Sequence, residues 1–184
     1  MNKSLFKTLV LTFSVVMAFH SGVNAAPAVG VSVSSQQQGM HQWQLPKGKL
    51  ILINGSYQDV TTYKRSLTFY FEDKPGSAWL HVPLINSDTD QDLTWFSISQ
   101  GEQTVSDAVV VPHAGSVELV IASTRPGALA AVAVRRYRLS EYSDDNPYGP
   151  AHYFKKISAA SYPSSAKLTV EQVLEKEGVS RLKK

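Results

Sequence analysis

The sequence predicts an all-β fold, an antiparallel β-sandwich with a short C-terminal α-helix. Short runs rich in Val, Ile, Thr, Phe, Tyr and Trp recur at roughly 8–12-residue spacing, with turn-forming residues between them. Apolar and more polar residues alternate within the runs, most clearly around Leu67, Phe69 and Phe71. Such alternation places one strand face against a core and the other toward solvent or a partner.

Eight strands are expected in the chain after its first 28 residues. They are expected at residues 29–34, 49–54, 66–72, 78–85, 93–99, 105–111, 117–122 and 128–139. The breaks between them contain turn formers such as Asn54-Gly55 and Arg125-Pro126-Gly127.

The C-terminal part, residues 140–184, is expected to hold a long loop and then a helix. Turn formers and aromatic residues fill residues 140–165 and favour an irregular connection. Thr169 is placed to cap the helix, with Gln172 as its reciprocal partner. The apolar stripe consists of Val170, Val173 and Leu174. Gly178 is expected to end the helix.

The first 25 residues have the pattern of a secretory signal peptide. Two lysines precede an apolar run at residues 9–19, and small residues follow, which places the cleavage site after Ala25. The run is shorter than the roughly 20 residues that span a bilayer, so no membrane span is predicted. An uncleaved anchor is the alternative. Residues 26–184 are expected to form a single exported domain.

Charge and cysteine content restrict the partners and the chemistry. Without the two leader lysines, the 18 basic residues fall to 16 against 15 acidic ones, a net charge of +1. This balance argues against a nucleic-acid partner. The chain has no cysteine, which excludes disulfides, thiol catalysis and a lipid-modified cysteine.

The sequence predicts no catalytic residue and therefore a protein that is not an enzyme. G-x-S-x-G is absent, and the S-x-x-K match at Ser164–Lys167 lacks the K-T-G element that accompanies it in penicillin-binding enzymes. We interpret Ser164 as a loop serine before a helix. The histidines of the mature chain lack the paired spacing of zinc sites.

A cation site is the one metal hypothesis that the sequence supports. Asp88, Asp90 and Asp92 are spaced like the first ligands of a calcium loop, but the glycine and the acid required further on are missing. Asp88 and Asp90 with a backbone carbonyl form the candidate site, and a solvated turn is the alternative. Residues 144–146 offer a second oxygen-rich loop.

Two arginines and a tryptophan are the candidate ligand-binding residues. Arg136 and Arg138 share one strand face, and arginine pairs bind carboxylates, phosphates and sugar acids. The alternative is an edge strand whose charges prevent aggregation. Trp79 is a candidate for stacking on a ligand, and burial in the core is its alternative.

Two segments carry a resemblance to a known family: Ser77-Ala78-Trp79-Leu80-His81-Val82-Pro83-Leu84 and Val109-Val110-Val111-Pro112-His113-Ala114-Gly115. With the export signal and the expected architecture, the mature chain resembles the carbapenem intrinsic resistance family, whose periplasmic members protect carbapenem producers from their own antibiotic. The resemblance implies a non-enzymatic homodimer that binds the drug or protects its target. It also implies a bound cation, which Asp88 and Asp90 are candidates to hold. The expected partner is a small-molecule antibiotic or an envelope protein.

Periplasmic inhibitors of invertebrate-type lysozyme share the expected sandwich and provide the second hypothesis. Those inhibitors use a Ser-Gly loop with a nearby tyrosine. The Ser-Gly pair of this chain, Ser21-Gly22, lies in the leader, and Asn54-Gly55-Ser56-Tyr57 is a loose counterpart in a predicted turn. An envelope immunity or binding module is a further alternative.

Overall fold

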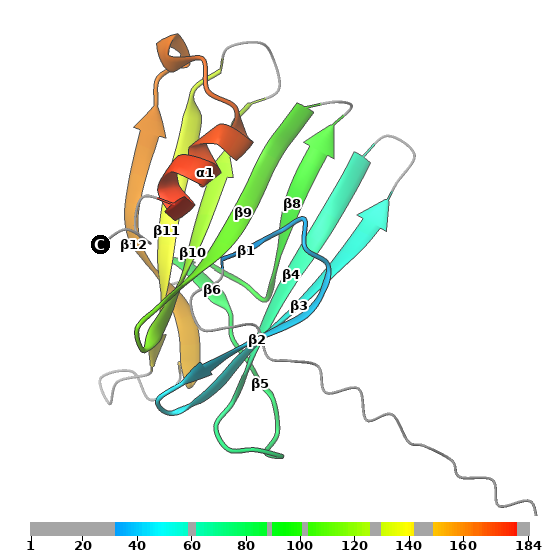
Figure 1. The fold of residues 1–184 in the computed structure, drawn as a ribbon, viewed down its shortest axis with the longest axis vertical. Helices are drawn as coiled ribbons and strands as arrows, with labels where there is room; N and C mark the ends of the chain where they lie inside the picture. The colour runs from blue at the N-terminus through cyan, green and yellow to red at the C-terminus, as the bar shows by residue number, and fades with distance from the viewer. Residues whose placement is uncertain are drawn as a thin grey trace, which may run out of the picture.

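A computed structural model describes residues 32–58, 62–87, 90–100, 103–125, 130–141 and 149–179. These residues are mostly β-strand, followed by a C-terminal helix (Figure 1). The elements in chain order are β1 (Val33–Ser34), β2 (Gly39–Leu45), β3 (Gly48–Gln58), β4 (Thr62–Glu72), β5 (Leu80–His81), β6 (Leu84–Ser87), β7 (Asp90–Asp92), β8 (Thr94–Gln100), β9 (Gln103–His113), β10 (Ser116–Ser123), β11 (Val132–Glu141), β12 (His152–Tyr162), a 3₁₀ turn (Ser164–Ala166) and α1 (Val170–Val179).

The sequence predicted an antiparallel sandwich, whereas the described strands pair along one path into a single sheet. The order is β2-β3-β4-β8-β9-β10-β11-β12-β6-β7, with β1 on β9 and β5 on β4. β12 and β6 run parallel, so the sheet is mixed. β8 and β9 pair near their connecting loop, with a bulge between Ile98 and Ser99, and then diverge as β9 goes on to pair with β1 (Figure 1). A bulge bends the strand that carries it, so the sheet curves without losing its continuity.

The inner face of this curved sheet holds the main core. Leu67, Phe69 and Phe71 of β4 all point inward and are buried, which confirms their predicted alternation. The Phe69 ring meets the ring of Phe154, from β12, edge to face at 4.8 Å between centroids. The core therefore joins the two halves of the sheet.

The predicted strand at residues 78–85 is divided by a proline. Leu80 is 38% exposed, whereas Val82 and Leu84 are buried. Pro83 has no amide hydrogen for a sheet ladder, and the chain crosses here from one half of the sheet to the other. The Val82 amide donates to the Phe69 carbonyl (2.9 Å), and the Phe154 amide donates to the Pro83 carbonyl (2.8 Å).

Two long strands were missing from the prediction. β2 was unassigned, and β12 fell within the predicted loop at residues 140–165. The Ser-Ala-Ala-Ser run at residues 158–161 has weak strand propensity, and its pairing with β11 overrides that preference. Asn54-Gly55-Ser56-Tyr57 lies inside β3, so the turn predicted there is also wrong.

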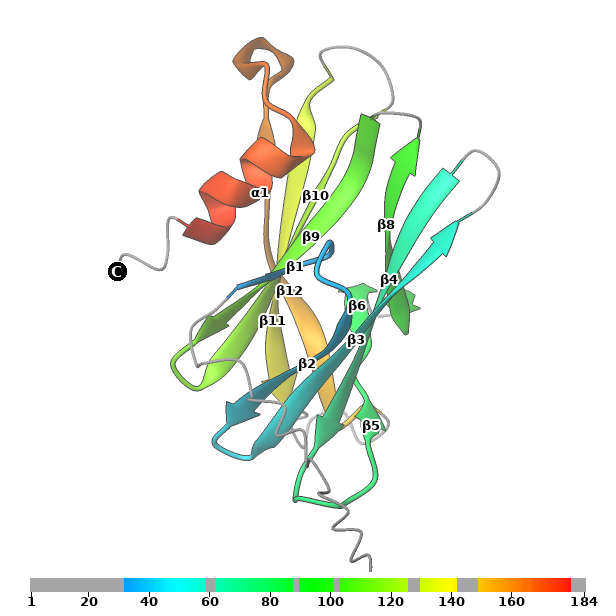
Figure 2. The same cartoon turned by 45° about the vertical axis from the view of Figure 1, so that its right-hand side comes forward.

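The C-terminal helix forms as predicted. The Thr169 amide donates to the Gln172 side chain (3.0 Å), and the Gln172 amide donates to the Thr169 hydroxyl (3.3 Å), a complete capping box. The helix ends at Val179, one residue beyond the predicted stop at Gly178. Its apolar stripe packs on the outer face of β9, β10 and β11, where it covers a second cluster of buried valines (Figure 2).

Within the described ranges, no helix is long and apolar enough to cross a membrane. The predicted signal peptide, residues 1–25, lies outside those ranges.

Candidate functional site

Arg136 and Arg138 share the outer face of β11, as predicted, and both reach Glu118 of β10. Arg138 donates to the Glu118 carboxylate from Nη2 (2.8 Å) and from Nε (3.3 Å). Arg136 Nη1 lies 3.5 Å from the other carboxylate oxygen, and His113 Nε2 lies at the same distance. Glu118 is only 1% exposed, and a buried carboxylate requires cationic partners such as these two arginines.

Arg136 also links α1 to the sheet through contacts with Glu177. It pairs with the Glu177 carboxylate and donates to the Glu177 carbonyl (3.1 Å). The Tyr162 hydroxyl donates to the same carboxylate (2.6 Å), and this bond raises the pKa of Tyr162 above its ordinary value. β11 lies between β10 and β12, so it is not the edge strand of the alternative interpretation. The arginine charges are matched by internal carboxylates.

Trp79 lies apart from this arginine pair. It belongs to the connection between β4 and β5, is 46% exposed, and its ring centroid lies 6.0 Å from that of Tyr70. Tyr70 in turn meets His81 edge to face at 4.9 Å. These rings lie on the β4–β5 side of the strand path, whereas the arginines lie on β11.

The predicted cation site is described in part. Asp88 lies outside the described residues, and Asp90 begins β7 as an exposed residue. Asp92 accepts a hydrogen bond from Asn86 (3.0 Å), which itself accepts one from Tyr137 (2.6 Å). The described residues contain no cluster of three or more His, Asp or Glu side chains suited to a metal. The cation stays a prediction.

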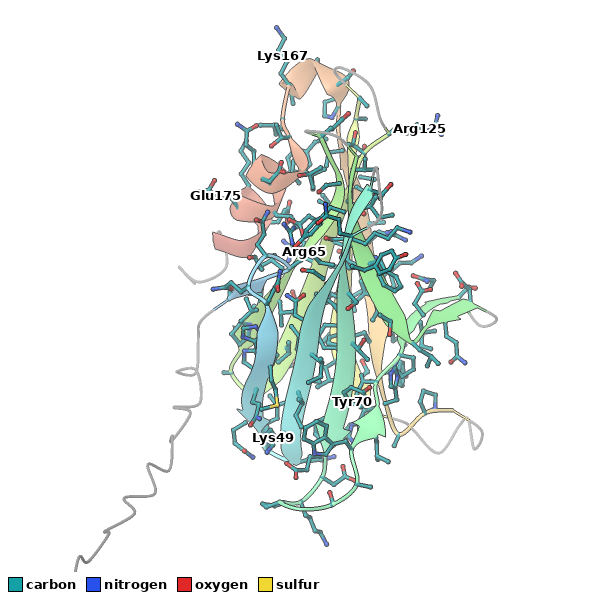
Figure 3. All side chains as sticks on the ribbon, turned by 90° about the vertical axis from the view of Figure 1, so that its right-hand side faces the viewer. Lys49, Arg65, Tyr70, Arg125, Lys167 and Glu175 are labelled. Carbon is teal, nitrogen blue, oxygen red and sulfur yellow. The ribbon has the colours of Figure 1, made fainter. Side chains whose placement is uncertain are left out.

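Lys167 is exposed at the end of the molecule near α1 (Figure 3), and Ser164, three residues before it, is also exposed. The Lys167 side chain points away from the body of the protein. Its amide donates to the Ser164 carbonyl (3.1 Å), and its backbone is left-handed, with φ of 52°. The described geometry therefore gives Ser164 no neighbouring base.

The described residues instead form cavities at the opposite end, around the turn that joins β2 to β3 (Figure 1). Gly48 makes this turn possible, with φ of 153°. A Cβ atom at this position would lie 2.6 Å from the Phe71 ring, too close for any side chain. The turn thus packs directly onto β4.

We call the cavity of about 250 Å³ at this turn the end cavity. It is lined by Leu45, Pro46, Lys47, Phe71, Gly115, Ser116, Leu139, Ser140, Glu141 and His152. Apolar side chains form much of its wall. Lys47 and Glu141 form an exposed ion pair beside it. The lining comes from five separate stretches of the chain, so the cavity exists only in the folded protein.

His152 is the most unusual residue of the end cavity. It is 8% exposed, and its ring stacks on Phe71 with 3.8 Å between centroids. Its Nε2 lies 3.1 Å from the Asp73 carboxylate. Its Nδ1 is buried and has no hydrogen-bond partner among the described residues. In the tautomer that donates from Nε2 to this carboxylate, Nδ1 is a hydrogen-bond acceptor.

Two further cavities adjoin the end cavity. The smaller, about 20 Å³, is on the order of one water in size. Trp43 Nε1 and His113 Nε2 on its lining are buried, and neither makes a hydrogen bond to another described residue, although His113 Nε2 lies 3.5 Å from the Glu118 carboxylate. The other, about 270 Å³, contains the Lys49–Glu72 ion pair. The hydrogen bond from Lys49 holds the pKa of Glu72 below its usual value, and the Gly76 amide adds to this effect.

The sequence prediction missed this end of the molecule. It considered histidines as metal ligands, whereas His152 pairs with the carboxylate of Asp73, directly after β4. In the sequence, His152 is followed by the aromatic residues Tyr153 and Phe154. That pattern alone does not predict a binding site.

Comparison with solved structures finds a match to the crystal structure of CarG, a carbapenem intrinsic resistance protein. The TM-score is 0.57 and the sequence identity 17%, over 74% of this chain and 94% of the CarG chain. No protein-family model and no curated protein matches the sequence. The family resemblance expected from the sequence is confirmed in the architecture, and the chain therefore has the fold of CarG.

Proposed function

We propose that this protein is an exported, non-enzymatic factor that protects its producer from a carbapenem β-lactam in the periplasm. The observation that carries the proposal is the fold shared with CarG, which extends over 94% of that chain. The predicted signal peptide supports a periplasmic location. A homodimer remains part of the proposal, and sedimentation velocity of the purified chain tests it.

The geometry favours binding of the drug over its hydrolysis. Lys167 lies at the end opposite the cavities, Ser164 three residues before it is exposed, and the described geometry gives Ser164 no general base. The end cavity, in contrast, has the volume of a small ligand, with apolar walls and a few polar groups. Sequestration of the intact drug is therefore the mechanism that we propose.

Carbapenem susceptibility of a sensitive Gram-negative host tests the proposal. We expect the full chain to raise the minimal inhibitory concentration, and a version without residues 1–25 to leave it unchanged. Drug incubated with purified protein is expected to remain chemically intact. Unchanged susceptibility with the full chain would refute the proposal, and inhibition of invertebrate-type lysozyme would then be measured by turbidity.

A further inference from the structure

The starting point is the unpaired nitrogen of His152. Buried polar groups in proteins nearly always have hydrogen-bond partners, so a buried atom without one calls for an explanation. His152 is more than nine-tenths buried, lines the end cavity, and has no partner at Nδ1 among the described residues. Its ring cannot easily turn away, because Phe71 stacks on it and Asp73 binds the other nitrogen.

The surroundings of His152 define the ligand chemistry. Nδ1 is an acceptor while Nε2–H is donated to Asp73, so it matches a hydroxyl or N–H group. Lys47, at the border of the cavity, is an exposed ammonium whose partner Glu141 is also exposed. Exposed pairs of this kind contribute little, so Lys47 can exchange Glu141 for an anion at low cost.

The walls define the size and the polarity of the ligand. Leu45, Phe71 and Leu139 provide apolar surface, and Ser116 provides a further hydroxyl. A volume of about 250 Å³ suits a compact molecule rather than a peptide or a glycan chain.

We propose that the end cavity binds a compact hydroxylated carboxylic acid, with His152 Nδ1 accepting a hydrogen bond from its hydroxyl or N–H group and Lys47 pairing with its carboxylate. This inference rests on the proposed function, because imipenem, a carbapenem with a hydroxyethyl side chain, is an acid of this kind. An envelope sugar acid such as N-acetylmuramic acid has the same groups, and the experiment includes both.

The test follows the imidazole nitrogens of the purified chain by ¹⁵N NMR while imipenem or N-acetylmuramic acid is added. We expect the Nδ1 signal of His152 to shift on binding of at least one of the two acids, and the ring signals of His81 to stay in place. His81 lies on β5 and lines none of the three cavities described above.

Two substitutions test the roles of the two ring nitrogens of His152 separately. His152→Gln keeps a donor near the Nε2 position, where it can bind Asp73, and removes the acceptor at Nδ1. His152→Asn keeps an acceptor near Nδ1 and loses the contact with Asp73. Loss of a hydrogen bond to a buried group is expected to weaken binding about tenfold in His152→Gln, and less in His152→Asn. His81→Gln is the matched control and is expected to bind normally.

The outcomes distinguish this inference from the proposed function. The His152 signal could shift with N-acetylmuramic acid alone, in a chain that gives no carbapenem protection. This result would support binding of an acid in the end cavity and refute the carbapenem as its ligand. Carbapenem protection could instead persist in His152→Gln, without any His152 shift in the native chain. This result would refute ligand binding in the end cavity and leave the proposed function intact. Equal weakening by both His152 substitutions would also overturn the inference, because it would indicate a structural role.

Discussion

The outer face beneath α1 and the end cavity both bury charged or polar side chains, but these side chains find their hydrogen-bond and ion-pair partners differently in the two regions. Under the helix, Glu118 contacts Arg136 and Arg138, and Arg136 continues to Glu177. In the end cavity, His152 has a partner at Nε2 and none at Nδ1 within the described part of the chain. A buried group whose partners are internal stabilises the fold, whereas a buried group with an open position is available to a ligand.

The largest expected effect comes from breaking the satisfied cluster. Arg136→Met removes the cation that joins Glu118 to Glu177 and leaves a buried carboxylate with one arginine fewer. Removing one partner of a buried pair destabilises a protein by about 3–5 kcal/mol. Urea denaturation followed by circular dichroism measures this loss. Arg138→Met is the matched control, since Arg138 is 51% exposed and its loss should cost less. Equal effects of the two substitutions would contradict the assignment.

Asp107 is an intermediate case, because its hydrogen bonds are made but its charge is poorly compensated. Its carboxylate accepts from the Ser35 hydroxyl and from the Ala108 amide (2.8 Å). Burial raises the pKa of Asp107 to about 6, partly opposed by the Ala108 hydrogen bond and the charge of Arg65, while Glu171 raises it further.

The raised pKa of Asp107 predicts a loss of stability as the pH rises. Below about pH 4 the carboxyl is protonated in both the folded and unfolded states, so burial of the group carries no charge penalty. Between about pH 4 and pH 6 the unfolded chain releases the proton first, and the folded state becomes less stable. Above about pH 6 the penalty is complete, on the order of 3 kcal/mol.

Asp107→Asn tests this window, because the amide keeps an acceptor for both hydrogen bonds and cannot ionise. We expect the substitution to gain stability relative to the native chain as the pH is raised from 4 to 7. Denaturation curves of both chains at several pH values measure the difference, from which other titrating groups cancel. Parallel pH profiles would show that Asp107 is already ionised at pH 4.

The smallest expected effect is that of His152→Gln, which removes Nδ1, on the stability of the protein without ligand. His152→Gln retains a donor for Asp73, and no described partner of Nδ1 is lost. We expect the free energy of unfolding to change by less than about 1 kcal/mol. The same urea titration measures it. A loss as large as that of Arg136→Met would place His152 with the structural cluster and remove the contrast between the two regions.

Local patterns of the sequence predicted what depends on neighbours in the chain. The alternation at Leu67, Phe69 and Phe71 predicted the inner face of β4, and the Thr169–Gln172 pair predicted the helix start. β12 was not predicted, because its strand conformation comes from pairing with β11 and not from its own residues.

The candidate site was harder to predict than the fold. Arg136 and Arg138 were found as a pair, but their carboxylate partners come from β10 and α1. The end cavity was missed, because it forms where the turn after Leu45 meets the ends of β4, β11 and β12. Whether Nδ1 of His152 has a hydrogen-bond partner there depends on tertiary contacts, which a single sequence does not reveal.

The crossing at Val82 and Pro83 has a consequence for how the chain folds. This segment is hydrogen-bonded to β4 on one side and to Phe154 of β12 on the other. A ribosome or a translocation pore delivers the N-terminal strands first, and Phe154 becomes available only near the end. Until then Phe69 lacks the aromatic ring that covers it in the folded state. Closure of the core is thus a late event that depends on contacts distant in sequence, and such topologies fold slowly.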